Sequence, residues 1–170
     1  MKNTDDELVE QSLGGASAAY DELVSRHLSA VFTHVRIMVH DDATAEDIVQ
    51  ESFIKAYEKL ASFNPKKAQF KTWLFTIATR KALDVLRKKP TVDVDDVVLE
   101  STLPSPKLRA EQREVRDAVQ SLEPKQRAVV SLYFWHGYDY QAISKTLKAP
   151  VGSIKGWMHR AKQVLKGKLS

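Results

Sequence analysis

The chain has 170 residues, of which 43% are hydrophobic, and a formal net charge of +4. Its length allows one domain or two small ones, and no apolar run approaches the roughly 18 residues of a membrane-spanning helix. The first eleven residues are acidic and lack the apolar stretch of a secretory signal. The absence of cysteine excludes disulfides and thiolate metal sites, and the five histidines do not pair at zinc-motif spacing. We therefore expect a cytoplasmic protein without a metal or another cofactor.

Charged residues are segregated along the chain. Residues 1–40 carry three more acids than bases, and residues 41–60 carry four more. Residues 61–89 hold eight bases and one acid, residues 90–106 hold four acids and no base, and residues 107–170 hold thirteen bases and five acids. A basic surface suits phosphate, whereas an acidic surface suits a basic protein. Any single block also fits a solvated helix face, but the alternation predicts at least two kinds of contact.

Three helices are predicted in the first half, because apolar residues recur there at three- and four-residue steps. The first is long and ends near His40. Asp41 provides an N-cap for the second, which runs to about Leu60. The third begins near Phe70 and ends at Lys89, and the three together are enough for one compact bundle.

The segment from 90 to 106 marks a domain boundary. It contains three prolines, four acids and an apolar cluster that has no helical partner face, which is typical of an extended linker. The predicted fold class is therefore all-α, with two small helical domains over residues 1–89 and 105–170. An acidic extended linker over residues 90–104 joins them.

The second domain is predicted to contain a helix-turn-helix. After helices over about 105–122 and 123–137, Asp139 caps a short helix, residues 148–150 form a turn, and Val151 opens a longer basic helix. In a helix-turn-helix the second helix lies in the major groove. This geometry also occurs in proteins that bind no DNA, but the basic charge of this domain favours DNA. The face opposite the apolar stripe presents Ser153, Lys155, Gly156, His159, Arg160 and Lys162.

Two strings resemble conserved regions of a known family. The string YQAISKTLKAPVGSIKGWMHRAK resembles the fourth conserved region of bacterial sigma factors, particularly the extracytoplasmic-function (ECF) group. TAEDIVQESFIKAYEKLASF, followed by FKTWLFTIATRKALDVLRKK, resembles the second conserved region. The two matches occur in the family's order and cover nearly the whole chain. The resemblance implies a non-enzymatic protein that binds core RNA polymerase and directs promoter-specific transcription initiation.

The resemblance implies several partners. Core RNA polymerase would be contacted at the clamp helices of its largest subunit and at the flap of its second-largest subunit. Promoter DNA and an anti-sigma factor are further expected partners, and no small-molecule substrate is expected. The acidic linker would thread towards the polymerase channels that hold RNA. The positions that match the clamp-helix contact share one helix face and are Asp47, Gln50, Glu51 and Ile54.

Two sets of residues match the family's promoter contacts. The set for the minus-ten element comprises Phe63, Asn64, Lys66, Lys67, Arg80, Lys81, Arg87 and Lys88. Core packing is the better interpretation for Phe70 and Trp73, whereas Phe63 fits either role. The set for the minus-thirty-five element comprises Ser153, Lys155, Gly156, Trp157, His159, Arg160 and Lys162.

The chain departs from the family's pattern at several positions. Lys148 stands at the turn where glycine is usual, and a left-handed conformation there would cost about 1 kcal/mol. Gly156 and Trp157 replace a small polar residue and an arginine. These changes leave the implied function standing but make the promoter sequence unpredictable from relatives.

Two other function classes compete with this interpretation. A conventional helix-turn-helix regulator would not associate with core polymerase, and it gives no role to the face around Asp47. An enzyme with a metal site would use the carboxylates at 41, 42, 46 and 47. However, caps and the helix dipole already explain acids at a helix start, and no nucleophile–base pair or phosphate-binding loop accompanies them.

Overall fold

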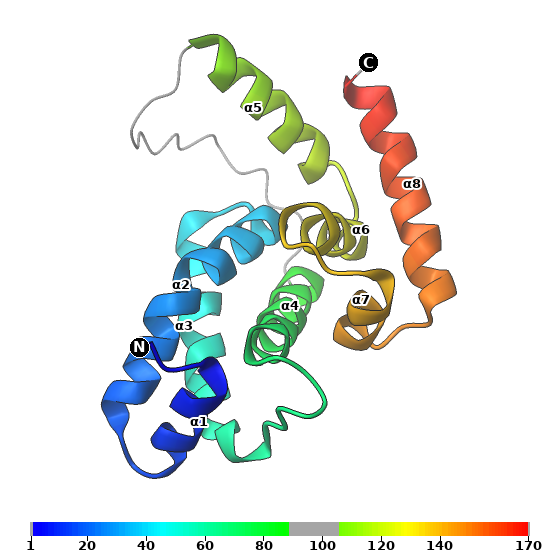
Figure 1. Cartoon of the computed structure of the whole chain (residues 1–170). Helices are drawn as coiled ribbons and strands as arrows, with labels where there is room; N and C mark the ends of the chain where they lie inside the picture. Colours follow the sequence, from blue (N-terminus) through cyan, green and yellow to red (C-terminus); the bar gives the residue numbers. More distant parts are fainter. Residues whose placement is uncertain (1, 89–105, 170) are drawn as a thin grey trace.

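The computed structural model describes residues 2–88 and 106–169, and every regular element in those residues is helical (Figure 1). The all-α class is thereby confirmed for this part of the chain, whereas the predicted acidic linker over 90–104 lies outside the described residues. The first half contains α1 (Asp5–Leu13), α2 (Ser17–Val39), α3 (Asp42–Glu58), the 3-10 helix η1 (Leu60–Ser62) and α4 (Phe70–Lys88). The second half contains α5 (Pro106–Gln120), α6 (Pro124–Val130), the π-helical turn η2 (Ser131–Trp135), α7 (Tyr140–Leu147) and α8 (Val151–Leu169).

The junction of α2 and α3 follows from local backbone chemistry. His40 adopts a left-handed conformation with φ 67°, and its N–H donates to the carbonyl of Arg36, which ends α2. Asp41 then caps α3, because its carboxylate accepts from the N–H of Thr44 at 2.9 Å. The predicted boundary at His40 and Asp41 is confirmed.

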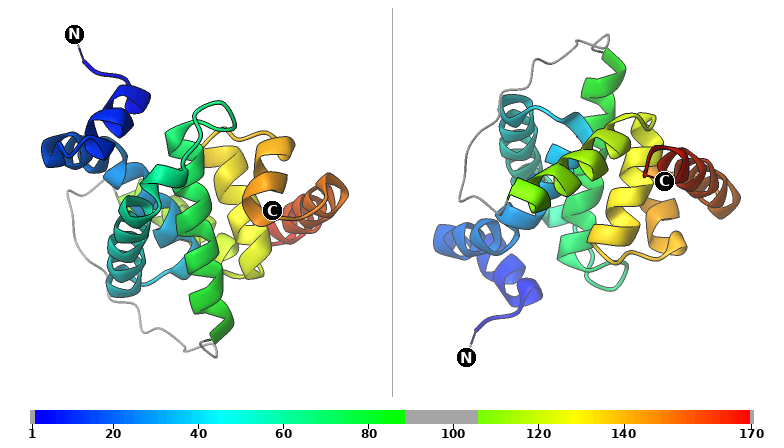
Figure 2. Two further views of the ribbon diagram at one scale, coloured as in Figure 1. Left: turned by 90° about the horizontal axis from the view of Figure 1, so that it is seen from below. Right: turned by 90° about the horizontal axis from the view of Figure 1, so that it is seen from above.

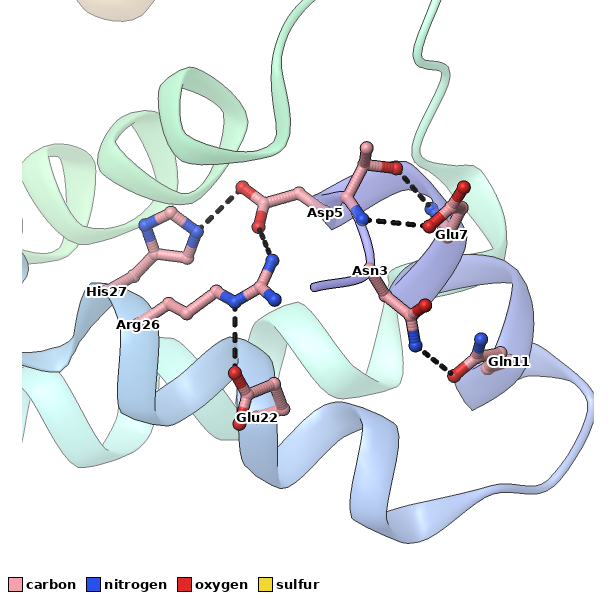
Figure 3. Close-up of polar contacts among 8 residues, drawn as sticks. Asn3, Asp5, Glu7, Gln11, Glu22, Arg26 and His27 are labelled. Carbon is pink, nitrogen blue, oxygen red and sulfur yellow. Dashed lines mark hydrogen bonds and ion pairs between the residues drawn. The ribbon is translucent and has the colours of Figure 1, made fainter. Parts of the chain in front are cut away.

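Helix α1 is an element that the hydrophobic pattern did not predict. Thr4 and Glu7 form a capping box: the Thr4 hydroxyl accepts from the Glu7 N–H, and the Glu7 carboxylate accepts from the Thr4 N–H (Figure 3). Leu8 and Val9 are buried. The sequence does contain the T-x-x-E signature of such a cap, so this helix start was detectable.

A polar network fastens α1 to α2. The Asp5 carboxylate lies 2.8 Å from His27 Nε2 and 3.3 Å from Arg26 Nη1, and Arg26 also pairs with Glu22 (Figure 3). The His27 ring is buried against Phe70, with ring centroids 5.6 Å apart. Asp5 therefore connects the N-terminal helix to the start of α4.

The two halves pack against each other instead of standing apart. Helix α4 lies between α3 and α7 (Figures 1 and 2). The buried apolar side chains form one continuous cluster that runs from Leu8 and Val9 in α1 to Ala161 in α8. Two sets of helices were predicted, but their shared core was not.

The second half differs from the prediction at one point. A single helix was expected over about 123–137, but α6 ends at Val130 and continues as the π-helical turn η2. The end of that turn fits the expectation, since Gly137 has φ 71°. Asp139 caps α7 as predicted, with its carboxylate accepting from the Ala142 N–H at 2.8 Å.

Candidate functional site

The helix-turn-helix is built from α7 and α8. Ile143 on α7 and Ile154 and Met158 on α8 are buried, so the two helices pack together through their apolar stripes. The turn between them requires a left-handed residue, and Lys148 provides it with φ 49° and ψ 49°. The strain of this conformation therefore falls on a residue with a Cβ atom, at a position where the family usually has glycine.

The outer face of α8 is polar and basic. Lys155, His159, Arg160 and Lys162 are exposed, whereas Ser153 and Gly156 are half-buried. Helix α8 lies at the edge of the molecule, with its outer side away from the other helices (Figure 2). Such a helix can present several cationic side chains to phosphate and base edges together.

Trp157 differs from its neighbours on α8. Its ring is half-buried against the core, and the ammonium of Lys125 on α6 lies 5.1 Å from the ring centroid. This arrangement is a cation–π contact within the fold. Trp157 therefore orients α8 on α6 with part of its surface while the rest stays accessible.

The loop between η1 and α4 is shaped by an asparagine turn. The side-chain oxygen of Asn64 accepts from the N–H of Lys66 at 2.9 Å, and its carbonyl accepts from the N–H of Lys67. Lys66 and Lys67 are exposed. Below the loop, Phe63 is buried and its ring centroid lies 5.7 Å from that of Phe70 and 5.3 Å from that of Trp73. Of the two roles open to Phe63, this structure places its ring in core packing.

The basic side chains of α4 have different partners. Lys81 pairs with Glu51 on α3, and Arg87 pairs with Asp84 one turn away. Lys88 is exposed. Arg80 instead reaches the helix-turn-helix, donating from Nε to the Thr146 carbonyl at 3.1 Å. The predicted minus-ten residues thus do not form a single free surface in this structure.

An acidic and apolar face is exposed on α3. Asp47, Gln50, Glu51 and Ile54 are all exposed, and the side chain of Ile54 is 54% exposed. The same face borders a groove of about 1320 Å³ between α2 and α3. Its apolar wall includes Val24, Leu28, Phe32, Phe53, Ile54 and Tyr57. Burial raises the pKa of Tyr20, which also lines the groove, to about 12 while its hydroxyl donates to the Phe53 carbonyl at 2.5 Å.

Within residues 2–88 and 106–169, no group of three or more His, Asp or Glu side chains is placed to hold a metal ion. The helices of the same residues include none that is long and apolar enough to cross a membrane.

Comparisons with known proteins match both halves. Residues 23–91 match the family Sigma-70 region 2, and residues 112–165 match Sigma-70, region 4. The ECF RNA polymerase sigma-E factor of Salmonella typhimurium is 32% identical, with 98% of this chain and 94% of that protein covered. The chain belongs to the ECF sigma factors of the sigma-70 family. It is an RNA polymerase sigma factor that directs transcription initiation, and it is not an enzyme.

Two further matches are consistent with this assignment. The RNA polymerase sigma-H factor of Pseudomonas aeruginosa is 29% identical to this sigma factor, with 95% of this chain and 91% of that protein covered. Among solved structures, CnrH in complex with the cytosolic domain of CnrY superposes with a TM-score of 0.74 at 25% identity. That match covers 98% of this chain and 97% of CnrH.

The structure also brings together residues that sequence reasoning did not single out. His34 on α2 is completely buried between Thr79 on α4 and Ser131 on η2. Its position on the apolar stripe of α2 was visible in the sequence. No local pattern connects it to Ser131, which lies 97 residues away.

Proposed function

We propose that this sigma factor docks on core polymerase through α3, with Asp47, Gln50, Glu51 and Ile54 contacting the clamp helices of the largest subunit. The main support is the combination of exposed acids with an apolar residue, Ile54, that is 54% exposed and borders an apolar groove. Acidic rims and apolar centres suit an amphipathic helical partner with basic flanks. The groove between α2 and α3 would receive the apolar side of that partner.

The promoter contacts are assigned to two proposed domains. The sigma region 2 domain, residues 1–89, would hold the minus-ten element with the 63–69 loop and α4. Exposed Lys66 and Lys67 support this role, because a basic loop can bind the backbone of an unstacked strand. Holding a flipped base costs a few kcal/mol, which contacts with the base and its phosphates must offset.

The sigma region 4 domain, residues 105–170, would read the minus-thirty-five element with α8. Lys155, His159 and Arg160 are exposed at the first turns of this helix, where recognition helices place their base contacts. Ser153, Gly156, Trp157 and Lys162 complete the proposed surface. The flap of the second-largest polymerase subunit is the expected protein partner of this domain.

An anti-sigma partner is proposed as well. The solved neighbour CnrH is bound to the cytosolic domain of CnrY. A partner that covered the α2–α3 groove here would compete with polymerase for the same apolar surface. Competition between that partner and core polymerase for the wild-type protein would support this assignment. Ile54→Ala should weaken binding of both proteins, and undiminished binding of the partner to this variant would contradict it.

The experiment that tests the proposed function uses purified full-length protein, core polymerase and a promoter library randomised at both elements. We expect defined start sites that share two upstream motifs. Asp47→Ala should abolish core binding, whereas Arg160→Ala should preserve core binding and relax the distal motif at one position. Asp6→Ala on α1 and Arg113→Ala on α5 change exposed residues of the same types and serve as matched controls.

Different failures have different meanings. Core binding that is unaffected by Asp47→Ala would refute the proposed docking face. Transcripts whose distal motif is unchanged at every position by Arg160→Ala would refute base reading by Arg160. Because the two variants test different partners, each assignment is decided independently of the other.

A further inference from the structure

The loop over residues 63–69 is anchored through aromatic rings at its two ends. Phe63 begins the loop and Phe70 follows it as the first residue of α4, and both are buried. Their ring centroids lie 5.7 Å apart, edge to face, and the ring of Trp73 lies 5.3 Å from Phe63 and 5.8 Å from Phe70. The hydrogen bonds of the Asn64 turn lie within the loop. They fix its shape, whereas the aromatic cluster fixes its place on the bundle.

A polar pair from α1 and α2 supports this cluster. The Asp5 carboxylate accepts from His27 Nε2 at 2.8 Å, and the His27 ring centroid lies 5.6 Å from that of Phe70 (Figure 3). The other carboxylate oxygen accepts from Arg26 at 3.3 Å, so both oxygens of Asp5 have partners. Asp5 is half-buried and His27 is buried, and a hydrogen bond in such surroundings is stronger than one in water. The bond therefore holds the imidazole in one orientation against Phe70.

Helix α1 also contacts the other end of the loop. It lies against η1, which leads directly into Phe63 (Figure 1). Leu8 and Val9 of α1 and Leu60 of η1 are buried in the same apolar core. The match to Sigma-70 region 2 begins at residue 23, so α1 precedes the matched residues. One helix outside that match thus supports both the entry to the loop and, through His27, its exit.

We propose that Asp5 and His27 are positioning residues for the minus-ten loop. Their hydrogen bond fixes α1 against Phe70, and the aromatic cluster passes this constraint to the loop that carries Asn64, Lys66 and Lys67. The inference rests on the proposed role of this loop in holding the minus-ten element. It extends that role to α1, which carries none of the residues proposed to contact the element.

A fixed loop matters more for recognition than for general affinity. Attraction between lysines and the phosphate backbone does not depend on sequence and tolerates small displacements. Contacts with a base require a defined geometry, and a loop that is ordered before binding does not lose that conformational freedom when the strand binds. Loss of the Asp5–His27 bond should therefore reduce discrimination between minus-ten sequences more than it reduces binding to single-stranded DNA in general.

Binding of the holoenzyme to single-stranded oligonucleotides tests the inference. One oligonucleotide carries the minus-ten motif selected from the promoter library, and the other has the same bases in permuted order. We expect Asp5→Ala to lower the ratio of the two affinities by about three- to tenfold, the order expected when one or two side chains must be ordered on binding. Core binding and the distal motif should not change, and wild-type core binding shows that the variant is folded.

Three further variants separate positioning from stability. His27→Ala should lower the ratio as Asp5→Ala does, and the double variant should lower it no further, because the two side chains act as a unit. Asp5→Asn, whose amide oxygen can still accept from His27, should recover most of the discrimination. Asp6→Ala removes the neighbouring exposed acid of α1 and serves as the matched control. Equal weakening of both oligonucleotides by Asp5→Ala would assign Asp5 to stability alone and overturn the inference.

A spectroscopic measurement reports on the loop without DNA. The chain has no cysteine, so Lys67→Cys places a single spin label on the exposed part of the loop. We expect the label to be more mobile with Asp5→Ala than with Asp6→Ala, and a label on Gln163→Cys in α8 to be unaffected by either. Unchanged mobility at position 67 would overturn the positioning role. If the wild-type holoenzyme did not prefer the selected oligonucleotide, the proposed function would fail, while the label would still decide whether Asp5 orders the loop.

Discussion

The ammonium of Lys81 on α4 and the carboxylate of Glu51 on α3 form an ion pair. Glu51 belongs to the proposed polymerase surface and Lys81 to the proposed minus-ten surface. The two side chains are 56% and 32% exposed, so solvent screens their attraction. Each side chain can therefore exchange its partner for polymerase or DNA at little cost in stability.

Replacement of this pair should separate function from stability. We expect Glu51→Gln and Lys81→Ala each to lower the free energy of unfolding by less than about 1 kcal/mol, because exposed ion pairs contribute little. Glu51→Gln should weaken core binding, whereas Lys81→Ala should weaken binding of the holoenzyme to minus-ten DNA. Urea denaturation and the two binding titrations measure these effects. A double-mutant coupling energy well above 1 kcal/mol would show instead that the pair mainly stabilises the fold.

Loss of the His34 side chain should destabilise the protein strongly. His34→Ala removes a fully buried ring and leaves the Ser131 and Thr79 hydroxyls without partners. We expect the free energy of unfolding to fall by about 2–4 kcal/mol. Urea denaturation measures the loss. His34→Gln, whose amide can donate to one hydroxyl and accept from the other, should recover part of it, and Thr33→Ala on the exposed side of α2 should be nearly neutral.

The stability of the protein should also depend on pH through His34 and the neighbouring His136. Burial, with a smaller effect of His136, lowers the pKa of His34 from 6.5 to about 3. Burial and then the charge of Lys71 lower the pKa of His136 to about 4. Between about pH 3 and 6.5 these two histidines bind more protons in the unfolded chain than in the folded one. Their contribution to the free energy of unfolding therefore falls as the pH falls through this range, and it is constant above about pH 7.

The titration of His34 should make the free energy of unfolding about 2 kcal/mol lower at pH 5 than at pH 7.5. Urea denaturation at the two pH values, compared between wild type and His34→Gln, isolates this contribution because glutamine does not titrate. An identical pH dependence in the two proteins would mean that His34 accepts its proton in the folded state.

Local signals predicted much of this fold. The acids at 41 and 139 marked helix starts correctly, and the apolar stripe of α8 placed its basic side outward. These features depend on residues within a few positions of one another, where capping and periodicity act. The T-x-x-E box at Thr4 is an equally local signal, which the apolar periodicity alone does not reveal.

The interface between the domains lacked such a signal. The contact between His34 and Ser131 joins residues 97 positions apart, and neither belongs to a motif. Arg80 was assigned to DNA because of its charge and its place in the family pattern, yet here it donates to backbone carbonyls. The sequence around a basic residue does not indicate which acceptor its side chain will bind. This contact could therefore be identified only in the three-dimensional structure.

The turn of the helix-turn-helix carries strain that can be removed. Lys148 has φ 49°, a conformation that costs a residue with a Cβ atom about 1 kcal/mol. Lys148→Gly should therefore raise the free energy of unfolding by up to about 1 kcal/mol. Lys148→Ala keeps the strain while removing the charge and should leave the stability nearly unchanged. Equal effects of the two substitutions in thermal or urea denaturation would attribute the change to charge instead.

The salt dependence of promoter binding should identify the role of each cation on α8. Arg160 and Lys162 are both exposed on this helix, but only Arg160 lies in the turns proposed to reach base edges. A residue that contacts phosphate alone lowers affinity for all sequences and reduces the salt slope by about one when it is removed. A residue that reads a base changes discrimination by about 1–3 kcal/mol at one position.

We therefore expect Arg160→Ala to relax the sequence preference at a single position of the minus-thirty-five element, and Lys162→Ala to reduce the salt slope without changing preference. Binding of the holoenzyme to a set of single-base promoter variants, measured at several salt concentrations, separates the two outcomes. If Arg160→Ala weakens binding to all promoter variants equally, Arg160 contacts phosphate and not a base. In that case His159 and Lys155, which are exposed at the same end of the helix, become the next residues to test for base reading.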